Sequence, residues 1–304
     1  MTVEGEPAEP PAPARRYDTI SVLTDYGTRD EFAGVVKAVI RDIAPHVVVV
    51  DLTHEIDPFD VRGGALTLAR CIPYVPSGVV LAVVDPGVAT SRRAVAVEVG
   101  GGAGVFVGPD NGLLAPAVAM AGGADRAVEL SNVDYQLVAA GATFAGRDVF
   151  APAAAHLCNG VPLSELGPEI DPGLLLPGVV PLPRQDGDAI VAEVLWVDRF
   201  GNCQLNLGPD DVADDVEHVQ LRIDAPADPA GLTVRSAVRA ASFAGIAGGG
   251  LGLVVDSYGM LAVCLDQRSA ADELGVAAGD QVVVVPLRDQ PEPPASPVTL
   301  RPNR

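Results

Sequence analysis

The chain is short of cysteine, and the few cysteines that it has are far apart. Its 304 residues include four, Cys71, Cys158, Cys203 and Cys264, with no CxxC pair and no histidine at metal-ligand spacing. This scatter argues against a disulfide framework and against a structural zinc site, since both need paired or closely spaced side chains. The pattern is typical of reduced thiols in a cytosolic protein.

Basic side chains are also scarce. The chain has 20 Lys and Arg residues against 40 Asp and Glu residues, which gives a formal net charge of −20. Such a balance argues against a nucleic-acid surface and against an anionic membrane partner. Any pocket for an anion would have to be built locally against this unfavourable field.

Long hydrophobic runs and the common signatures of nucleotide and hydrolase sites are missing as well. No apolar stretch reaches the roughly 18–20 uncharged residues of a membrane span. Residues 1–16 are acidic and proline-rich without an apolar core, so we expect a disordered tail rather than a signal peptide, and a cytoplasmic protein. GxGxxG, P-loop, GxSxG and metal-binding runs are all absent from the sequence.

The first half of the chain alternates two kinds of pattern. Apolar runs predict buried strands, and amphipathic or alanine-rich stretches predict helices. The strand-like runs are residues 17–24, 46–52, 78–83 and 104–107, and the helix-like stretches are residues 30–43, 60–70, 114–121 and 151–157. This alternation predicts an N-terminal α/β domain over residues 17–164, with a mostly parallel sheet and helices on both faces.

The second half has a different character. Residues 165–188 carry several prolines and glycines and predict a linker. Residues 189–287 contain short strand-like runs separated by turn residues, which predict a small antiparallel barrel or sandwich. These runs are residues 190–197, 203–207, 219–223, 232–234, 252–255, 260–265 and 281–285. The proline-rich residues 288–304 predict a second disordered tail.

An acid follows the buried run 78–83 at Asp85, and Arg92 comes seven residues later. The carboxyl ends of strands in α/β sheets are where ligands usually bind. A guanidinium beside a carboxylate lowers the pKa of the acid and keeps it ionised, and such a pair can orient a water whose proton Asp85 accepts. A structural salt bridge that pins the loop explains the same two residues equally well.

Other polar clusters follow strands or form turns. Asp25 is placed to accept two hydrogen bonds from a ribose diol. The alternative is an N-cap of the following helix, for which Asp30 is the better candidate. For His54 the alternatives are a ligand or base and a hydrogen-bonded structural residue. For Phe59 they are a cover over a flat ring and a core residue. Three further segments are by themselves ordinary turn and hairpin chemistry. They are residues 108–112, 198–202 and 257–259.

Taken in order, these segments resemble the S-adenosylmethionine hydrolase family, also called S-adenosylmethionine hydroxide adenosyltransferases, which is related to the fluorinases and chlorinases. The resemblance runs from about Tyr17 to Leu287. It is carried by LTDYG, VDLTHEIDPFD, VDPGVATSRR, VGPDNGLL, TFAGRDVFAPAAAHL, VDRFGN, and DSYG followed by SAADELG. It implies an α/β domain, a C-terminal β-barrel and a homotrimer whose active sites lie between one subunit's N-domain and its neighbour's C-domain.

The resemblance also implies a reaction. Water attacks C5′ of S-adenosyl-L-methionine in line with the departing sulfonium and gives adenosine and L-methionine, with no metal or cofactor. Asp85 and Arg92 match two of the three groups that position the water in the family. Asp25 would hold the ribose hydroxyls, and Phe59 would pack along the substrate.

In the second domain, the resemblance implies contacts to both ends of the substrate. Asp198, aided by Ser257, would take the methionine ammonium. Asn202 would read the adenine edge, and Phe200 would stack on the purine. Backbone near Arg268 and Ala270 would complete the adenine pocket.

The chain departs from the family at one position. The third water-positioning group is a histidine, which should fall between Phe144 and Gly146, where this chain has Ala145. Hydrolysis by Asp85 and Arg92, with a second water in the space of the imidazole, is the leading hypothesis. The alternatives are a halogenase that forms a 5′-halo-5′-deoxyadenosine, and a non-catalytic protein that binds S-adenosylmethionine or adenosine. Asp85 disfavours halide binding, since a halide a few Å away is repelled by roughly 4 kcal/mol at an effective dielectric of about 20.

Overall fold

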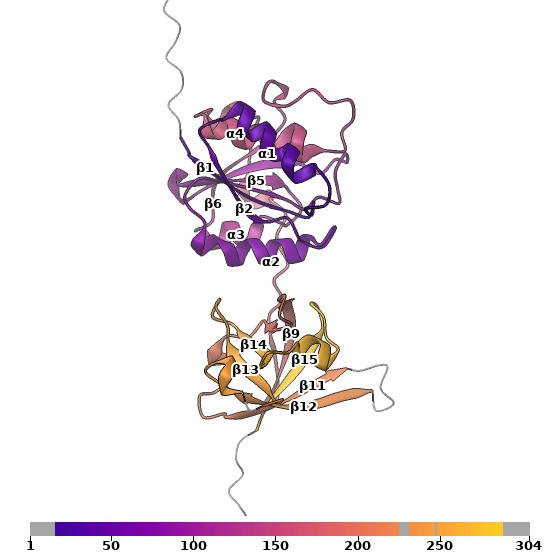
Figure 1. Cartoon of the computed structure of the whole chain (residues 1–304). Coiled ribbons are helices and arrows are strands. Elements are labelled where there is room, and N and C mark those ends of the chain that lie inside the picture. Colours follow the sequence, from indigo (N-terminus) through magenta and orange to yellow (C-terminus); the bar gives the residue numbers. More distant parts are fainter. Residues whose placement is uncertain (1–15, 225–230, 247, 288–304) are drawn as a thin grey trace, which may run out of the picture. The chain divides into compact units, whose positions relative to one another are not determined.

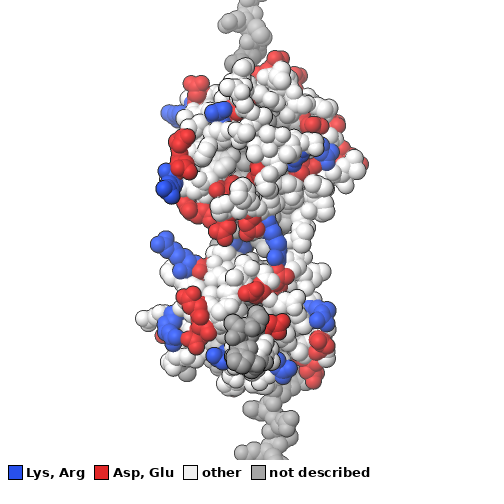
Figure 2. Space-filling view, turned by 90° about the vertical axis from the view of Figure 1, so that its right-hand side faces the viewer, with Lys and Arg blue, Asp and Glu red and all other residues white. Residues whose placement is uncertain are grey.

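The computed structural model describes residues 16–224, 231–246 and 248–287, which form two compact units. The units are Met1–Val180 and Pro181–Arg304, and Figure 1 shows the elements of each. Red acidic side chains are spread over the face of each unit that Figure 2 shows, as the charge balance of the sequence predicts.

The first unit is built on a seven-stranded sheet in the order β2-β1-β3-β5-β4-β6-β7. Its strands are β1 (Thr19–Thr24), β2 (Val48–Thr53), β3 (Val79–Val83), β4 (Ala94–Val99), β5 (Gly104–Pro109), β6 (Ala124–Glu129) and β7 (Glu169–Ile170). The neighbours β2, β1, β3 and β5 run parallel. All five residues of β3 are buried, as expected for a central parallel strand that is covered on both faces.

Helices cover both faces of this sheet, which confirms the predicted α/β class. They are α1 (Phe32–Ile43), α2 (Val61–Cys71), α3 (Ala115–Met120) and α4 (Ala151–Cys158). Helices α1 and α4 pack together over one face, and α2 and α3 pack together over the other (Figure 1). Helix α1 buries Ala33, Val36 and Ile40, whose spacing of three and four places them on one side.

The sequence patterns missed strands β4 and β6 and placed one helix cap wrongly. Strand β4 is antiparallel to both β5 and β6, so this part of the sheet is not parallel. The N-cap of α1 is Glu31 with no side-chain hydrogen bond, so Asp30 does not cap it. Asp60, by contrast, caps α2 by accepting a 2.8 Å bond from the N–H of Gly63.

The second unit is a closed barrel of seven strands in the order β10-β14-β13-β12-β11-β15-β9, which the pairing of β9 with β10 closes. The barrel strands are β9 (Ala189–Val197), β10 (Cys203–Leu205), β11 (His218–Asp224), β12 (Leu232–Arg239), β13 (Leu251–Val255), β14 (Leu261–Leu265) and β15 (Gln281–Leu287), and the short strand β8 (Arg184–Asp186) pairs with β9 beside them. Among the described strands of this unit, only β12 and β13 pair in parallel. The barrel that the resemblance implies is therefore confirmed, and the sandwich is not formed.

Part of the segment 165–188, which the sequence predicted to be a linker, belongs to the two sheets. Strand β7 pairs with β6, and β8 pairs with β9. Strands of two or three residues are too short to leave a periodic pattern, so no sequence signal predicts them. At the N-terminal end, Arg16 was assigned to a tail, but its guanidinium bonds Glu98 at 2.5 Å. The other predicted tail residues lie outside the described ranges.

Single helical turns complete the described structure. They are η1 (Ile72–Tyr74), η2 (Gly100–Gly102), η3 (Val133–Tyr135), η5 (Leu163–Glu165), η6 (Pro172–Leu174), η7 (Pro209–Asp211), η8 (Phe243–Gly245), the π-helical η4 (Gly146–Phe150) and the short α-helix α5 (Ala270–Leu274). Within the described residues, no helix combines the length and apolarity needed to cross a bilayer. Nor do three or more His, Cys, Asp or Glu side chains of that part converge as metal ligands.

Candidate active site

A cavity of about 270 Å³ opens in the first unit where β1 and β3 end. The segments that follow β1, β2 and β3, together with the start of η4, form its wall. The lining residues are Asp25, Tyr26, Asp30, Phe32, Pro58, Phe59, Asp85, Val88, Thr143, Phe144, Ala145 and Gly146. The fold thus brings three sequence-predicted site residues, Asp25, Phe59 and Asp85, to one cavity, together with Ala145.

Asp85 and Arg92 form a two-bond ion pair. Arg92 Nε donates to Asp85 Oδ1 at 3.0 Å, and Arg92 Nη2 donates to Asp85 Oδ2. Both side chains are largely buried, with 6% of Asp85 and 12% of Arg92 exposed. The guanidinium also lies 5.3 Å from the ring centroid of Phe150, the last residue of η4. The pair is therefore a rigid salt bridge, and its carboxylate belongs to the wall of the cavity.

Burial raises the pKa of Asp85 above its ordinary value of 3.8. The charge and hydrogen bonds of Arg92 and the backbone N–H of Gly87 lower the pKa but offset only part of this effect. The sequence-based expectation of a lowered pKa is therefore wrong in sign, because the sequence does not reveal how deeply the loop is buried. A carboxylate with a raised pKa accepts a proton more readily than an exposed aspartate.

The turn after β5 holds both ends of the Asp85 loop. Asn111 Nδ2 donates to the carbonyl of Val84 at 2.8 Å, and its Oδ1 accepts from the N–H of Leu113 at 3.1 Å. Next to it, Asp110 Oδ2 accepts from Arg93 at 2.9 and 2.5 Å. The structural interpretation of the Asp-Asn-Gly turn is therefore correct. The sequence did not predict that this turn lies beside Asp85. The pairing of β5 with β3 brings it there.

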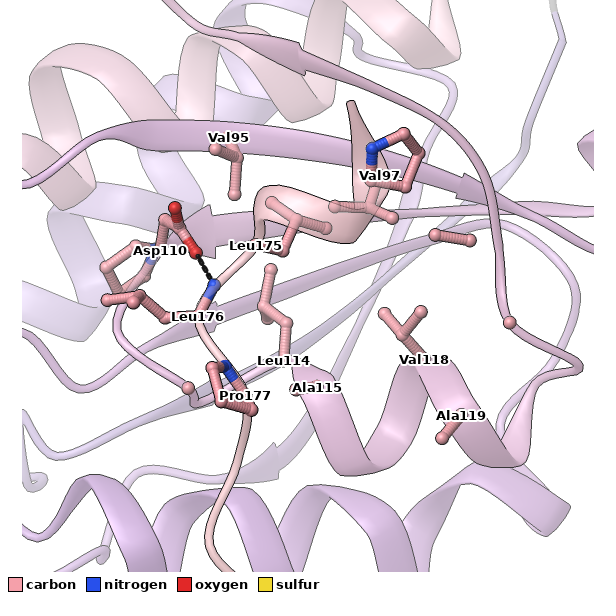
Figure 3. A pocket seen from close by; sticks show the side chains of 15 residues that line it. Val95, Val97, Asp110, Leu114, Ala115, Val118, Ala119, Leu175, Leu176 and Pro177 are labelled. Atoms are coloured by element: carbon pink, nitrogen blue, oxygen red, sulfur yellow. Dashed lines mark hydrogen bonds between the residues drawn. The ribbon is translucent and has the colours of Figure 1, made fainter. Parts of the chain in front are cut away.

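The same turn borders a second cavity of the first unit, which Figure 3 shows. This cavity has a volume of about 240 Å³ and is lined mainly by apolar side chains such as Val95, Leu114 and Leu176. The carboxylate of Asp110 accepts the N–H of Leu176 at 2.8 Å (dashed line in Figure 3) and also binds Arg93. Ligand sites combine an apolar wall with polar groups that remain available. The Asp85 cavity therefore remains the candidate active site.

Asp25 and Phe59 meet at the edge of the Asp85 cavity. Asp25 Oδ2 accepts the N–H of Phe59 at 3.0 Å. Phe59 has a φ of +70°, which is unusual for a residue with a side chain, and 71% of it is exposed. The core-filling alternative for Phe59 is therefore wrong, and Asp25 is not a helix cap. Backbone strain of this kind concentrates at functional sites.

His54 lies behind the cavity rather than in its wall. It is buried, and its Nδ1 and Nε2 lie 2.8 Å from Thr24 Oγ1 and 3.1 Å from Asp51 Oδ1. Thr24 Oγ1 in turn accepts the N–H of Tyr26 at 3.2 Å. His54 is thus the hydrogen-bonded structural residue of the two alternatives, and it holds the end of β1 in place.

Ala145 occupies the cavity wall directly before η4. One π-helical turn inside or beside an α-helix is frequently found at functional sites. His156, the nearest histidine along the chain, sits on α4 and packs on the ring of Tyr135 at a centroid distance of 5.0 Å. It is not among the residues that line the cavity, so it does not replace a histidine at position 145.

The second unit has a cavity of its own, with a volume of about 460 Å³. Its lining residues are Phe200, Asn202, Phe243, Leu265, Asp266, Gln267, Arg268 and Ser269. Three predicted residues, Phe200, Asn202 and Arg268, are thereby brought together. Phe243 was missed, because one phenylalanine in an irregular segment has no distinguishing pattern. Phe200 and Phe243 are 76% and 47% exposed, which leaves apolar surface available to a flat ligand.

Asp198 organises the turn that carries Phe200 and Asn202. Its Oδ1 accepts the N–H groups of Phe200 and Asn202 at 2.8 and 2.9 Å, and its Oδ2 accepts Asn202 Nδ2 at 2.8 Å. Gly201, with φ +82°, allows this turn to lie against Ser269, whose Oγ would be 2.1 Å from a Cβ at that position. Asp198 itself is not among the residues that line the cavity.

The two remaining predicted residues, Ala270 and Ser257, are also not among the residues that line this cavity. Ala270 is fully buried at the start of α5, next to Ser269 in the wall. Ser257 lies in the turn between β13 and β14, where Asp256 accepts the N–H groups of Tyr258 and Met260. Their roles toward a substrate stay predictions.

Comparison with known proteins agrees with the division into two units. Residues 20–167 match the model of the SAM hydroxide adenosyltransferase N-terminal domain, and residues 192–283 match that of the C-terminal domain. The chain is 46% identical over 265 residues to the (R)-S-adenosyl-L-methionine hydrolase of Salinispora arenicola, covering 87% of this chain and 97% of the relative. A fluorinase from Actinoplanes is more distant, at 28% identity over 64% of this chain and 73% of the fluorinase.

A solved structure is similar throughout. An uncharacterised conserved protein from Thermotoga maritima superposes with a TM-score of 0.76 at 34% sequence identity. The match covers 88% of this chain and 99% of that protein.

Proposed function

The chain belongs to the SAM hydroxide adenosyltransferase family, and we propose that it hydrolyses S-adenosyl-L-methionine to adenosine and L-methionine. The observation that carries this proposal is the Asp85 carboxylate, held by Arg92 in the wall of the cavity that also contains Asp25 and Phe59. A carboxylate in such a place accepts a proton from a water molecule beside it.

The substrate supplies its own leaving group, because the positively charged sulfur departs as the neutral thioether of methionine. The protein has to align water, C5′ and sulfur, which is a matter of orientation. Asp25, Asp30 and Asp85 line the cavity, so their negative charge complements a sulfonium cation. Arg92 fixes the Asp85 carboxylate by two hydrogen bonds and thereby sets the direction in which it accepts the proton.

The same carboxylate disfavours halogenation. A halide about 4 Å from an ionised Asp85 is repelled by about 4 kcal/mol at an effective dielectric of 20, which Arg92 offsets in part. The fluorinase relative is also less similar to this chain than the Salinispora hydrolase is. No feature of the described structure specifically favours the halogenase or the purely binding alternative.

We further propose a homotrimer in which the Asp85 cavity of one subunit and the Phe200 cavity of a neighbour together enclose the substrate. Phe59 in the first unit and Phe200 in the second each leave most of a ring uncovered within their own unit. Asp198 and Ser257 would then bind the methionine end, and Asn202 with backbone near Arg268 and Ala270 would bind the adenine. The four cysteines are free thiols, which supports a reducing, cytoplasmic location.

Product analysis tests the proposal. The protein is incubated with each sulfonium epimer of S-adenosylmethionine, with and without chloride, and the products are separated by chromatography. We expect adenosine and methionine in equal amounts, at a rate that is independent of chloride. Formation of 5′-chloro-5′-deoxyadenosine would establish the halogenase alternative. Tight binding of the substrate without any product would establish the binding protein.

A further inference from the structure

Tyr26 brings a hydroxyl group to the segment where Ala145 stands. Its hydroxyl oxygen lies 2.2 Å from the point that a Cβ of residue 146 would occupy. Gly146 therefore leaves the space that the phenol fills, directly beside Ala145. Tyr26, Gly146, Ala145 and Asp85 all line the same cavity, so the phenol that lies against Gly146 belongs to its wall.

The ring of Tyr26 is held by its neighbours. It packs on Phe32 and Phe144 at centroid distances of 5.9 and 5.7 Å. The backbone N–H of Tyr26 donates to Thr24 Oγ1 at 3.2 Å, and Thr24 is itself bonded to His54. No hydrogen bond of the Tyr26 hydroxyl joins it to a residue that the structure describes. The hydroxyl is thus fixed in position while its bonding capacity remains available to a molecule in the cavity.

We propose that the Tyr26 hydroxyl holds the attacking water from the side opposite Asp85 and so takes the place of the missing histidine. The inference rests on the proposed hydrolysis. One O–H of the water is bonded to the Asp85 carboxylate, and the other is accepted by the Tyr26 oxygen. Both lone pairs of the water are then free, and one of them points at C5′.

The step balances without a further reactant. The C5′–O bond forms as the C5′–S bond breaks, and the electron pair of that bond goes to sulfur, which leaves as methionine. The proton lost by the water passes to Asp85 and from there to solvent. Tyr26 keeps its own proton throughout and only orients the water.

The surroundings of Tyr26 favour the protonated phenol. Burial, together with the carboxylates of Asp25 and Asp85, raises its pKa well above the ordinary value of 10.0, and Arg92 offsets part of this. Asp30 is the further charged residue in the wall of the cavity, and Phe32 and Phe144, which pack on the ring, carry no charge. A histidine has an ordinary pKa of about 6.5, so unlike the phenol it changes charge in the range between pH 5 and 8.

The test compares four proteins: the wild type, Tyr26→Phe, Ala145→His and the double variant. We expect Tyr26→Phe to lower kcat about 10- to 100-fold with little change in KM, the effect of one lost hydrogen bond to the reacting water. Ala145→His should restore much of kcat in the Tyr26→Phe background but add little to the wild type. The double variant should also acquire an acid limb near pH 6.5 that the wild type lacks.

A matched control is Tyr135→Phe, because Tyr135 packs on His156 and is not among the residues that line the cavity, so the change should leave kcat unchanged. Full kcat in Tyr26→Phe would overturn the inference while leaving the proposed hydrolysis intact. A loss of kcat that is accompanied by a lower melting temperature, and that Ala145→His does not restore, would also overturn it. Failure of the wild type to release adenosine would instead contradict the proposed function itself.

Discussion

Asp85 in the first unit and Asp198 in the second both follow the end of a strand, yet their carboxylates are used differently. Asp85 is bonded to an arginine seven residues away and faces a cavity. Asp198 accepts three hydrogen bonds from the turn that it begins. An acid after a parallel strand is supported by neighbouring loops, so it can face a ligand. The carboxylate of an acid in a tight hairpin instead accepts hydrogen bonds from the N–H groups of its own turn.

The two cavities also differ in the side chains that form their walls. The first has three carboxylates in its wall and suits a cation that is about to react. The second presents the exposed rings of Phe200 and Phe243 and suits recognition of a flat group. This comparison predicts that changes in the first unit act mainly on kcat, and that changes in the second act mainly on KM or on stability.

The largest effect is expected for Asp85→Asn. The amide keeps the size of the side chain but accepts a proton poorly, so kcat should fall about 10²- to 10⁴-fold. Adenosine release measured by chromatography gives the rate. Asp198→Asn is the matched control in the other unit and should mainly raise KM. If Asp198→Asn lowered kcat as strongly as Asp85→Asn, the division between the two units would be wrong.

Gly201→Ala should destabilise the protein by about 2–4 kcal/mol, because its positive φ is strained for alanine and the new Cβ would overlap Ser269. Thermal unfolding followed by circular dichroism measures the change. Gly187→Ala is the control, since that glycine has a φ of +61° but nothing within 4 Å of a Cβ. Equal effects of the two variants would show that the contact with Ser269 is unimportant.

Phe200→Ala should raise KM about tenfold or more, because stacking of a base on an aromatic ring contributes about 1–3 kcal/mol. Its kcat should change little. Steady-state kinetics separates the two parameters, and Phe200→Tyr should preserve both. A large loss of kcat in Phe200→Ala would mean that this ring takes part in alignment as well as in binding.

The smallest effect concerns pH. Protonation of Asp85 removes the proton acceptor, and burial raises its pKa, so activity should fall on the acid side at a pH above 3.8. A profile of kcat against pH for the wild type locates this limb. Full kcat maintained below pH 3.8 would show that Asp85 does not have to be ionised.

Much of the fold could be predicted because buried parallel strands leave continuous apolar runs, as β3 does. Strand β4 was missed although its sequence, Ala-Val-Ala-Val-Glu-Val, is apolar with one acid. Glu98 is buried there because Arg16 and Arg126 bond it. These partners lie 82 and 28 residues away, so no local pattern shows them.

The candidate site was predictable in part for a similar reason. Strand ends that meet in one sheet bring Asp25 and Asp85 together, and the resemblance to a family supplied Phe59 and Phe200. Tyr26 and Phe243 were missed as site residues, because their role depends on which side chains the fold brings next to them. The direction of the pKa shift of Asp85 was missed because it depends on burial, which outweighs the arginine.

The turn after β5 has a consequence for the dynamics of the Asp85 loop. Both ends of that loop are tied to it, through Asn111 to Val84 and through Asp110 to Arg93. The two ends of the loop are therefore anchored, and Asp85 and Arg93 are expected to keep their places until β3 and β5 separate. On heating, the geometry of Asp85 should persist up to the cooperative melting of the first unit.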